Sequence, residues 1–204
     1  MMLAYLNFIV LVISSCLALY FYIRSAGPAA LEKKVGEAAY AACGRYRVIS
    51  SVFMFVILAN FVLYTLYPLP MGLPRTFPWD WWVSLVLAAV IGVPSGYLMW
   101  LGIRDAGEET MAPKKEHGMY QGIYRKIRHP QAAGELPLWF AIAFVLHSPF
   151  LLLFSLLYIP AWIYMCVAEE RDLAIRYGQA YEEYRKNTGF WLPRRRAGEN
   201  RQGT

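Results

Sequence analysis

Charged residues and cysteines are scarce in this sequence, whereas hydrophobic residues are abundant. Only 17% of its 204 residues are charged, and 58% are hydrophobic. An ordinary soluble domain has about a quarter of its residues charged, so this composition indicates an integral membrane protein instead. The three cysteines, Cys16, Cys43 and Cys166, have no paired spacing and predict no disulfide framework. The three histidines lack an HExxH-like spacing, and no metal site is expected.

Long apolar runs account for most of the chain. A bilayer core of about 30 Å needs about 20 apolar residues per helix. The runs predict an all-α, polytopic membrane protein with five transmembrane helices at 3–22, 48–67, 82–103, about 130–147 and 150–168. His147, Ser148 and Pro149 interrupt the last apolar block, so the fourth and fifth helices are expected to form a tight hairpin. The first run is too long for a cleaved signal peptide and no Lys or Arg precedes it.

Positive charge is nearly absent from one side of the membrane in this arrangement. With the N-terminus outside, the inner segments hold five, six and eight of the 20 Lys and Arg residues, and only Arg75 lies outside. Cytoplasmic loops carry such an excess of basic residues. A count of four spans is rejected, because it puts the basic C-terminal tail on the opposite side from the basic segment at 104–128. Topology thereby explains the net charge of +6, and no nucleic-acid partner is expected.

Two polar segments flank the predicted hairpin. The first, at 118–135, has the sequence GMYQGIYRKIRHPQAAGE, and the second, at 168–193, has the sequence AEERDLAIRYGQAYEEYRKNTGFWLP. A carboxylate near the membrane is costly without a partner, and adjacent helical positions lie about 100° apart. We therefore expect one of Glu169 and Glu170 to face a pocket and the other to brace the cationic segment.

The second polar segment also predicts a cytoplasmic C-terminal helix. Asp172 is expected to pair with Arg176, and Glu182 with Lys186, because oppositely charged residues at i and i+4 are neighbours on a helix. The remaining residues, 194–204, are basic and are predicted to form a disordered tail near anionic membrane lipids.

Together the two polar segments resemble the membrane methyltransferase superfamily that contains isoprenylcysteine carboxyl methyltransferases and phospholipid N-methyltransferases. In that superfamily a GxYRxxRHPxxxGE segment and an EExxLxxxYGxxYxxYxxxTGxxxP segment bind S-adenosylmethionine. The resemblance covers 118–193, and the apolar spans before it are not part of the resemblance. One departure is Ala132, where relatives commonly carry an aromatic residue. The matching residues are Gly122, Tyr124, Arg125, Arg128, His129, Pro130, Gly134, Glu135, Glu169, Glu170, Leu173, Tyr177, Gly178, Tyr181, Tyr184, Thr188, Gly189 and Pro193.

The resemblance implies an S-adenosylmethionine-dependent methyltransferase whose single domain spans 1–193, with the motifs at 118–193. His129 is expected to bind the head group or ribose of the cofactor, and Arg128 to neutralise a carboxylate. Glu135, an acid inside a span, is expected to pair with Arg128 or with the sulfonium of the cofactor. We assign Arg128 and Glu135 as candidate catalytic residues. The candidate cofactor-binding residues are Met119, Tyr120, Gly122, Tyr124, His129, Pro130, Gly134, Glu169 and Glu170.

Two further expectations concern the walls of such a site. Gly134 has no side chain and would let a helix backbone or the cofactor approach closely. Tyr120, Tyr124 and Tyr177 would wall the adenine or attract the sulfonium through cation–π contacts.

The acceptor is expected to be a membrane lipid, with either an isoprenylcysteine-like carboxylate or a phospholipid amine as the nucleophile. A lipid-anchored acceptor is costly to extract into water, so the cytoplasmic-side site is expected to open sideways, with the helices around Pro94 and Pro160 as walls. Two other functions stay open: a nicotinamide-dependent membrane reductase of the sterol type, which shares a late Arg-His element, and a non-enzymatic membrane adaptor. Binding of adenosylmethionine or nicotinamide analogues would discriminate among the three.

Overall fold

The computed structural model describes residues 1–115 and 121–194, and within these residues it is helical with no β-strand. The all-α prediction is confirmed for this part of the chain. In chain order the elements are α1 (Met2–Ser25), α2 (Pro28–Val35), α3 (Ala38–Leu66), α4 (Trp81–Ala106), the 3-10 helices η1 (Gly107–Thr110) and η2 (Gly122–Arg125), α5 (Pro130–Val145), α6 (Pro149–Leu156), α7 (Tyr158–Tyr177) and α8 (Gln179–Asn187).

Four helical segments in the described residues are long and apolar enough to cross a membrane: Met2–Ser25, Ala38–Leu66, Trp81–Thr110 and Pro149–Tyr177. They contain the first, third and fifth predicted spans and all of the second except Tyr67. The fourth predicted span forms α5, which has 16 residues. At 1.5 Å per residue such a helix extends about 24 Å, less than the hydrocarbon core of about 30 Å. The count of five spans therefore stays a prediction.

The last apolar helix differs from the prediction along its length. It is interrupted at Leu157, between α6 and α7, and then continues to Tyr177 instead of ending at 168. The helix ends where Gly178 adopts a positive φ of 56°, a conformation typical of a glycine that follows a helix. Glu169 and Glu170 consequently lie on a continuous helix that leaves the apolar bundle.

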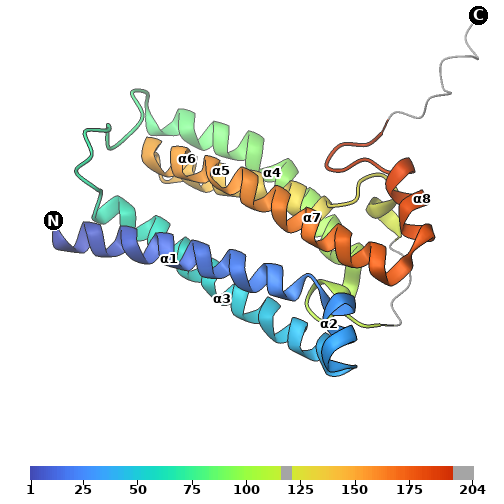
Figure 1. Cartoon of the computed structure of the whole chain (residues 1–204). Coiled ribbons are helices and arrows are strands. Elements are labelled where there is room, and N and C mark those ends of the chain that lie inside the picture. The colour runs from blue at the N-terminus through green and yellow to red at the C-terminus, as the bar shows by residue number, and fades with distance from the viewer. Residues whose placement is uncertain (116–120, 195–204) are drawn as a thin grey trace, which may run out of the picture.

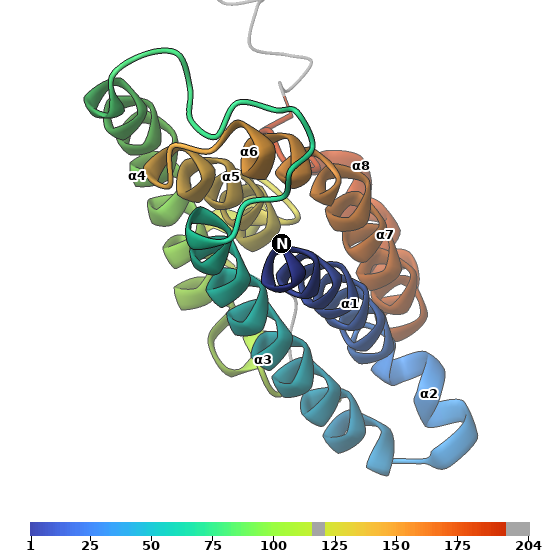
Figure 2. The same cartoon turned by 90° about the vertical axis from the view of Figure 1, so that its left-hand side faces the viewer.

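The helices pack as two groups that share one core. Helix α1 lies along α3, and α4 lies along α5, with α6 and α7 beside α5 (Figures 1 and 2). Aromatic rings join the two groups. The ring of Phe61 on α3 lies 5.3 Å from that of Trp139 on α5 in an edge-to-face contact, and 6.4 Å from that of Tyr158 on α7 in a stacked contact. Such ring pairs add to the free energy gained by burial.

Glycines allow α4 and α5 to approach closely. A Cβ atom at Gly134 would lie 2.5 Å from both the backbone nitrogen of Met99 and the carbonyl oxygen of Ser95. A Cβ atom at Gly102 would lie 2.7 Å from Cγ of Gln131. Both distances are far below van der Waals contact, so the expected close approach at Gly134 is that of the α4 backbone.

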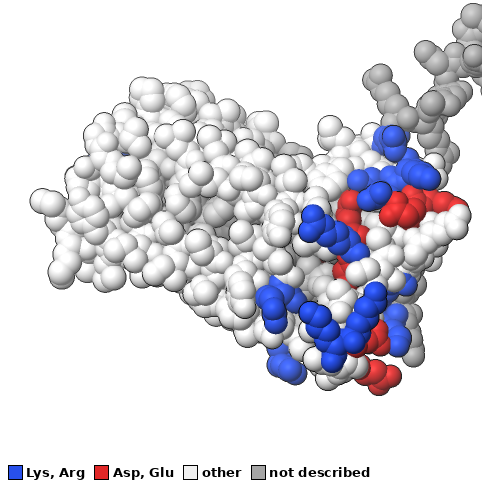
Figure 3. Space-filling model, in the orientation of Figure 1, with Lys and Arg blue, Asp and Glu red and all other residues white. Residues whose placement is uncertain are grey.

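Charged side chains gather at one end of the molecule, where α2 and α8 lie, and the N-terminus lies at the other end (Figures 1 and 3). The surface between them shows few charged side chains in this view (Figure 3). Large side chains on the long helices are exposed, including Phe55 at 72% and Val93 at 71%. Continuous apolar exposure on this scale is expected of a surface that contacts lipid. The several apolar helices thus fit an integral membrane protein.

Candidate functional site

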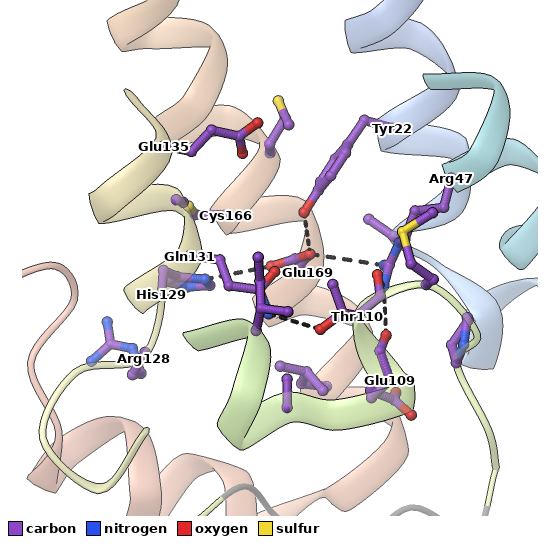
Figure 4. Close-up of a pocket in the computed structure, with 18 of the residues that line it drawn as sticks. Tyr22, Arg47, Glu109, Thr110, Arg128, His129, Gln131, Glu135, Cys166 and Glu169 are labelled. Atoms are coloured by element: carbon purple, nitrogen blue, oxygen red, sulfur yellow. Dashed lines mark hydrogen bonds and ion pairs between the residues drawn. The ribbon is translucent and has the colours of Figure 1, made fainter. Parts of the chain in front are cut away.

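A cavity of about 250 Å³ lies near the charged end of the bundle (Figure 4). Its walls come from α1, α3, the junction of α4 with η1, η2, α5 and α7. Both polar segments found in the sequence contribute to these walls, together with residues from the N-terminal helices. The polar residues discussed below are Tyr22, Arg47, Glu109, Thr110, Tyr124, Arg128, His129, Gln131, Glu135, Glu169, Asp172 and Arg176.

Backbone hydrogen bonds join the two polar segments directly. The N–H of Arg128 donates to the carbonyl of Gly189 at 2.8 Å, and the N–H of His129 donates to the carbonyl of Phe190 at 3.2 Å. Ile127 and Gly189 form an isolated parallel β-bridge, which we call the 127/189 bridge. The two polar segments therefore meet in the folded chain, next to the cavity that Arg128 and His129 line.

The two adjacent glutamates on α7 have different surroundings. Glu169 lines the cavity, with its Oε2 atom 3.5 Å from Nδ1 of His129. Oε1 of Glu170 accepts a hydrogen bond from Nε of Arg128 at 2.7 Å and lies 3.1 Å from Nε2 of His129. One glutamate therefore faces the cavity while the other braces the cationic segment, as expected from the helical offset between adjacent residues.

His129 lies between these two carboxylates just before α5. The residue is only 5% exposed. Burial alone lowers the pKa of His129, but contacts with Cys166, Glu169 and Glu170 outweigh burial and hold the pKa well above the usual range of a histidine. The protonated ring is thus the form that suits this position between two anions.

Arg128 makes several contacts within the protein. Besides Glu170, its guanidinium donates to the carbonyl of Arg185 at 3.0 Å and to that of Thr188, near the end of α8. Its Cζ atom also lies 5.5 Å from the ring centre of Phe190. Arg128 thus fastens α8 and the residues that follow it to the start of α5.

Glu135 lines the cavity from α5, next to the indole of Trp162 and near the carboxylate of Glu169. Within residues 1–115 and 121–194, no ion pair joins Glu135 to a Lys, Arg or His side chain. Arg128, the protein partner expected for it, is paired with Glu170 instead. That expectation was wrong because the guanidinium points along the polar segment toward α8.

Several cavity residues were missed by the sequence analysis. Tyr22 and Arg47 come from the first two apolar spans and meet at Glu169: Tyr22 Oη donates to its Oε1 atom at 2.6 Å, and Nη2 of Arg47 lies 3.9 Å from the same atom. Glu109 pairs with Arg176 at 2.6 Å, and both side chains are buried. The available signal was weak, since a cation or tyrosine near the end of a span is common in membrane proteins.

A glutamine inside the first motif connects three elements at the cavity wall. Nε2 of Gln131 lies 3.0 Å from Oγ1 of Thr110, 3.0 Å from Oη of Tyr124 and 3.3 Å from the carbonyl of Gly102. Tyr124 also lines the cavity, and burial raises the pKa of its hydroxyl, which therefore stays protonated at neutral pH. Of the three tyrosines expected as walls, Tyr124 alone is placed on the cavity by the described residues.

Three other residues predicted to form the site contact neighbouring parts of the protein and do not line the cavity. Gly122 has a φ of 60°, and a Cβ atom there would lie 2.1 Å from Oδ2 of Asp105, so this position requires glycine. Pro130 is buried at the start of α5 against α4. Tyr177 lies beside the guanidinium of Arg176, with 5.1 Å between Cζ and the ring centre. Met119 and Tyr120 lie outside the described residues.

The two predicted i,i+4 ion pairs on the second polar segment are not those observed. Asp172 is 4% exposed and accepts hydrogen bonds from the backbone N–H groups of Ala29 and Ala30, at 3.2 and 2.9 Å. It therefore caps the N-terminus of α2, while Arg176 pairs with Glu109. Glu182 pairs with Arg185, three residues along, at 2.8 Å. For Asp172, buried hydrogen bonds to α2 thus replace the predicted ion pair with Arg176.

A second cavity, of about 220 Å³ and almost entirely apolar, adjoins the first. The two share Met54, Trp162 and Met165 on their walls. Helices α1, α3, α6 and α7 line the apolar cavity. Helix α7, which carries Pro160, contributes to the wall of the apolar cavity, whereas the part of α4 around Pro94 does not. A sideways opening between the helices around these prolines stays a prediction.

The polar cavity has a set of groups that fits S-adenosylmethionine. Glu169 supplies a carboxylate, Tyr22 and Thr110 supply hydroxyls, and Met99 and Ala132 supply apolar wall. Carboxylates and hydroxyls suit the amino and ribose groups of that molecule, and apolar side chains suit its adenine. Within residues 1–115 and 121–194, no group of three or more His, Cys, Asp or Glu side chains is arranged to hold a metal ion.

Fold and site together define a helical membrane protein with a charged cavity near one end of its bundle. Residues 82–180, just under half of the chain, match the family model described as phospholipid methyltransferase. This segment is therefore a phospholipid methyltransferase domain of the membrane methyltransferase superfamily identified from the motifs, and that family implies methyltransferase activity. A search of curated proteins and a search of solved structures returned no match.

Proposed function

We propose that this protein transfers a methyl group from S-adenosylmethionine to the amine of a membrane-embedded lipid. The family match supports methyl transfer, and the charges around the cavity support the two ligands. The observation that carries the choice of an amine is Glu135, a carboxylate on the cavity wall that is in no ion pair with the described residues.

The cavity favours a cationic or basic ligand over an anionic one. Its three arginines are each matched to a glutamate: Arg47 to Glu169, Arg128 to Glu170 and Arg176 to Glu109. A carboxylate acceptor would have to compete with those glutamates for a cation. An amine can approach Glu135 without breaking any ion pair, and a buried charge is stabilised by gaining a partner.

Glu135 would act on the proton of the acceptor. A lipid amine is protonated at neutral pH and must lose a proton before its lone pair can form the new C–N bond. Glu135 is proposed to accept that proton, as a general base. When bound, S-adenosylmethionine supplies a methyl group on a positively charged sulfur, and transfer leaves that sulfur neutral. His129 and Arg47 hold Glu169 at the cavity wall.

The adjoining apolar cavity would receive a hydrocarbon chain of the acceptor. Trp162 lies on both cavities and beside Glu135, so a head group at Glu135 leads directly to apolar walls. Burying each methylene of a lipid chain contributes about 0.8 kcal/mol. The acceptor can then react without leaving an apolar environment.

Titration and transfer measurements test the proposal. Detergent-solubilised protein is titrated calorimetrically with S-adenosylhomocysteine, and methyl transfer from radiolabelled S-adenosylmethionine is followed with two acceptors, a phosphatidylethanolamine and an isoprenylcysteine analogue. We expect binding of adenosylhomocysteine and transfer to the amine lipid. Absence of binding at millimolar ligand, or binding of a reduced nicotinamide dinucleotide instead, would overturn the proposal.

The Glu135→Gln variant tests the role of the carboxylate. We expect transfer to the amine lipid to fall by about 100-fold or more, the scale of general base catalysis. Affinity for adenosylhomocysteine should change little, because that ligand lacks the sulfonium charge. Glu108→Gln is the control, since Glu108 is an exposed glutamate that pairs with Lys114 and is not one of the residues that line the cavity. Unaffected transfer to the amine lipid in Glu135→Gln would rule out Glu135 as the general base. Transfer that occurs only with the carboxylate acceptor would rule out an amine acceptor.

A further inference from the structure

Glu169 is held by side chains that lie outside the family domain. Its Oε1 atom accepts the 2.6 Å hydrogen bond from Tyr22 near the end of α1, and its Oε2 atom faces His129. The family match begins at residue 82, so α1 and α3 are not part of it. The two oxygens of one carboxylate are therefore fixed from opposite sides of the cavity by different parts of the chain (Figure 4).

Arg47 of α3 supports the same carboxylate and links it to the rest of the cavity rim. Its Nη1 atom donates to the carbonyls of Glu109 and Thr110 at 2.9 and 3.0 Å, while its Nη2 atom lies 3.9 Å from Glu169. Its Cζ atom lies 5.8 Å from the ring centre of Tyr22. The side chain of Arg47 is only 14% exposed, so these interactions are little screened by water.

We infer that Tyr22 and Arg47 are positioning residues of the cofactor site: they fix the orientation of Glu169 and balance its charge. The inference rests on the proposed function, in which Glu169 binds the cofactor. It also assigns a role to the N-terminal helices beyond membrane anchoring. Those helices complete the cavity, because residues 82–180 lack both groups that hold Oε1 of Glu169.

A double-mutant cycle tests the inference through binding. The affinity of the full chain for S-adenosylhomocysteine is measured for wild type, Tyr22→Phe, Glu169→Gln and the double variant. We expect Tyr22→Phe to weaken binding by about tenfold, since hydrogen bonds to charged groups are the stronger ones. In the Glu169→Gln background the same change should cost clearly less, because the neutral amide oxygen of glutamine accepts a weaker hydrogen bond from Tyr22 than the carboxylate does.

Two further variants separate positioning from general damage. Tyr46→Phe removes a tyrosine hydroxyl from the same pair of helices, outside the cavity walls, and should keep wild-type affinity. Arg47→Lys keeps the charge and should retain more affinity than Arg47→Gln. Melting temperatures in detergent without ligand report whether each variant folds.

The outcomes distinguish this inference from the proposed function. If the wild type fails to bind adenosylhomocysteine, the proposed function falls and the inference falls with it. If the wild type binds but the losses from Tyr22→Phe and Glu169→Gln simply add, Tyr22 does not act through Glu169. In that case the proposed function stands and the positioning role is overturned.

Discussion

His129 shows how strongly one side chain in the site depends on its neighbours. It comes just before α5, is almost fully buried, and has a carboxylate near each ring nitrogen. An unpaired histidine in such a place would be neutral, because burial penalises charge. The two glutamates reverse that preference, so the ring serves as a charged link between α7 and the start of α5.

This arrangement predicts a pH dependence of stability. The folded-state pKa of His129 lies above the unfolded value of about 6.5. Its protonation therefore stabilises the fold fully below about pH 6.5, and this contribution is lost as pH rises through the folded pKa. We expect the melting temperature of the wild type in detergent to fall over that interval, and that of His129→Gln to change less. His147→Gln, near the opposite end of the bundle, is the matched control; equal slopes for wild type and His129→Gln would contradict the prediction.

Asp172 shows that residue spacing within one segment does not always predict the partner of a charged side chain. A neighbour four residues away predicts an ion pair with Arg176, but Asp172 is buried against the start of α2 and accepts two backbone hydrogen bonds there. The competing partner lies more than 140 residues earlier in the chain, as the sequence separations of 143 and 142 show. No periodicity within the segment contains that information.

At the scale of elements, the contact between α4 and α5 depends on the absence of side chains. Gly134 faces the backbone of α4 at a separation that leaves no room for a methyl group. Because α5 carries Gln131, Ala132 and Glu135 into the cavity, the depth at which it packs on α4 sets the position of those residues. Helix packing and site geometry are thus coupled through one glycine.

The Gly134→Ala variant tests this coupling. An added methyl group 2.5 Å from two backbone atoms has to push the helices apart, at a cost of about 1–3 kcal/mol. Gly96→Ala on α4 is the control, because no atom lies within 4 Å of a Cβ placed there, and alanine favours a helix over glycine by about 1 kcal/mol. Thermal unfolding in detergent should show a loss for Gly134→Ala and none for Gly96→Ala. Equal stability of the two variants would show that α4 and α5 can separate freely.

The sequence predicts the elements better than their ends. Apolar runs located α1, α3 and α4 because lipid-facing helices are apolar around most of their circumference. The ends were less well defined: α3 begins at Ala38 and α7 runs to Tyr177, since polar residues extend these helices beyond the apolar core. Composition marks where a helix leaves lipid, whereas capping residues such as Gly178 mark where it stops.

For the whole molecule, the charge distribution bears on how the chain lies in a membrane. The N-terminus lies at the end opposite α8 and the charged surface (Figures 1 and 3). Although α5 is short, it carries the chain from the cavity back toward the end where α6 begins. We therefore expect the N-terminus outside and α8 on the cytoplasmic side.

Cysteine accessibility in intact cells measures this topology. In a variant without the native cysteines, Met2→Cys should react with a membrane-impermeant maleimide, whereas Glu183→Cys should react only after permeabilisation. Arg75→Cys, in the connection between α3 and α4, is the control for an outer position and should be labelled without permeabilisation. Labelling of Met2→Cys and Glu183→Cys under the same condition would mean that α5 does not cross and that the predicted count of five is wrong.

The sequence predicts the motif residues of the candidate site but not the residues that α1 and α3 contribute, and the reason is physical. Motif residues such as His129, Glu135 and Glu169 stand out because they belong to two polar segments whose order and spacing match those of a known superfamily. Tyr22 and Arg47 do not stand out, because they lie near the ends of spans where tyrosine and arginine are common. Their importance comes from meeting Glu169 in three dimensions, which depends on how α1 and α3 pack against α7.

The 127/189 bridge also has a consequence for the order of events during synthesis. Ribosomes deliver a chain from its N-terminus, and domains assemble as their parts emerge. The bridge joins the start of α5 to Gly189, and Arg128 reaches the carbonyls of Arg185 and Thr188. All the helices that surround the cavity are therefore made before the residues that fasten its rim. A nascent chain can insert its apolar helices early, yet it can form the contacts that fasten the cavity rim only after residue 189 has been made.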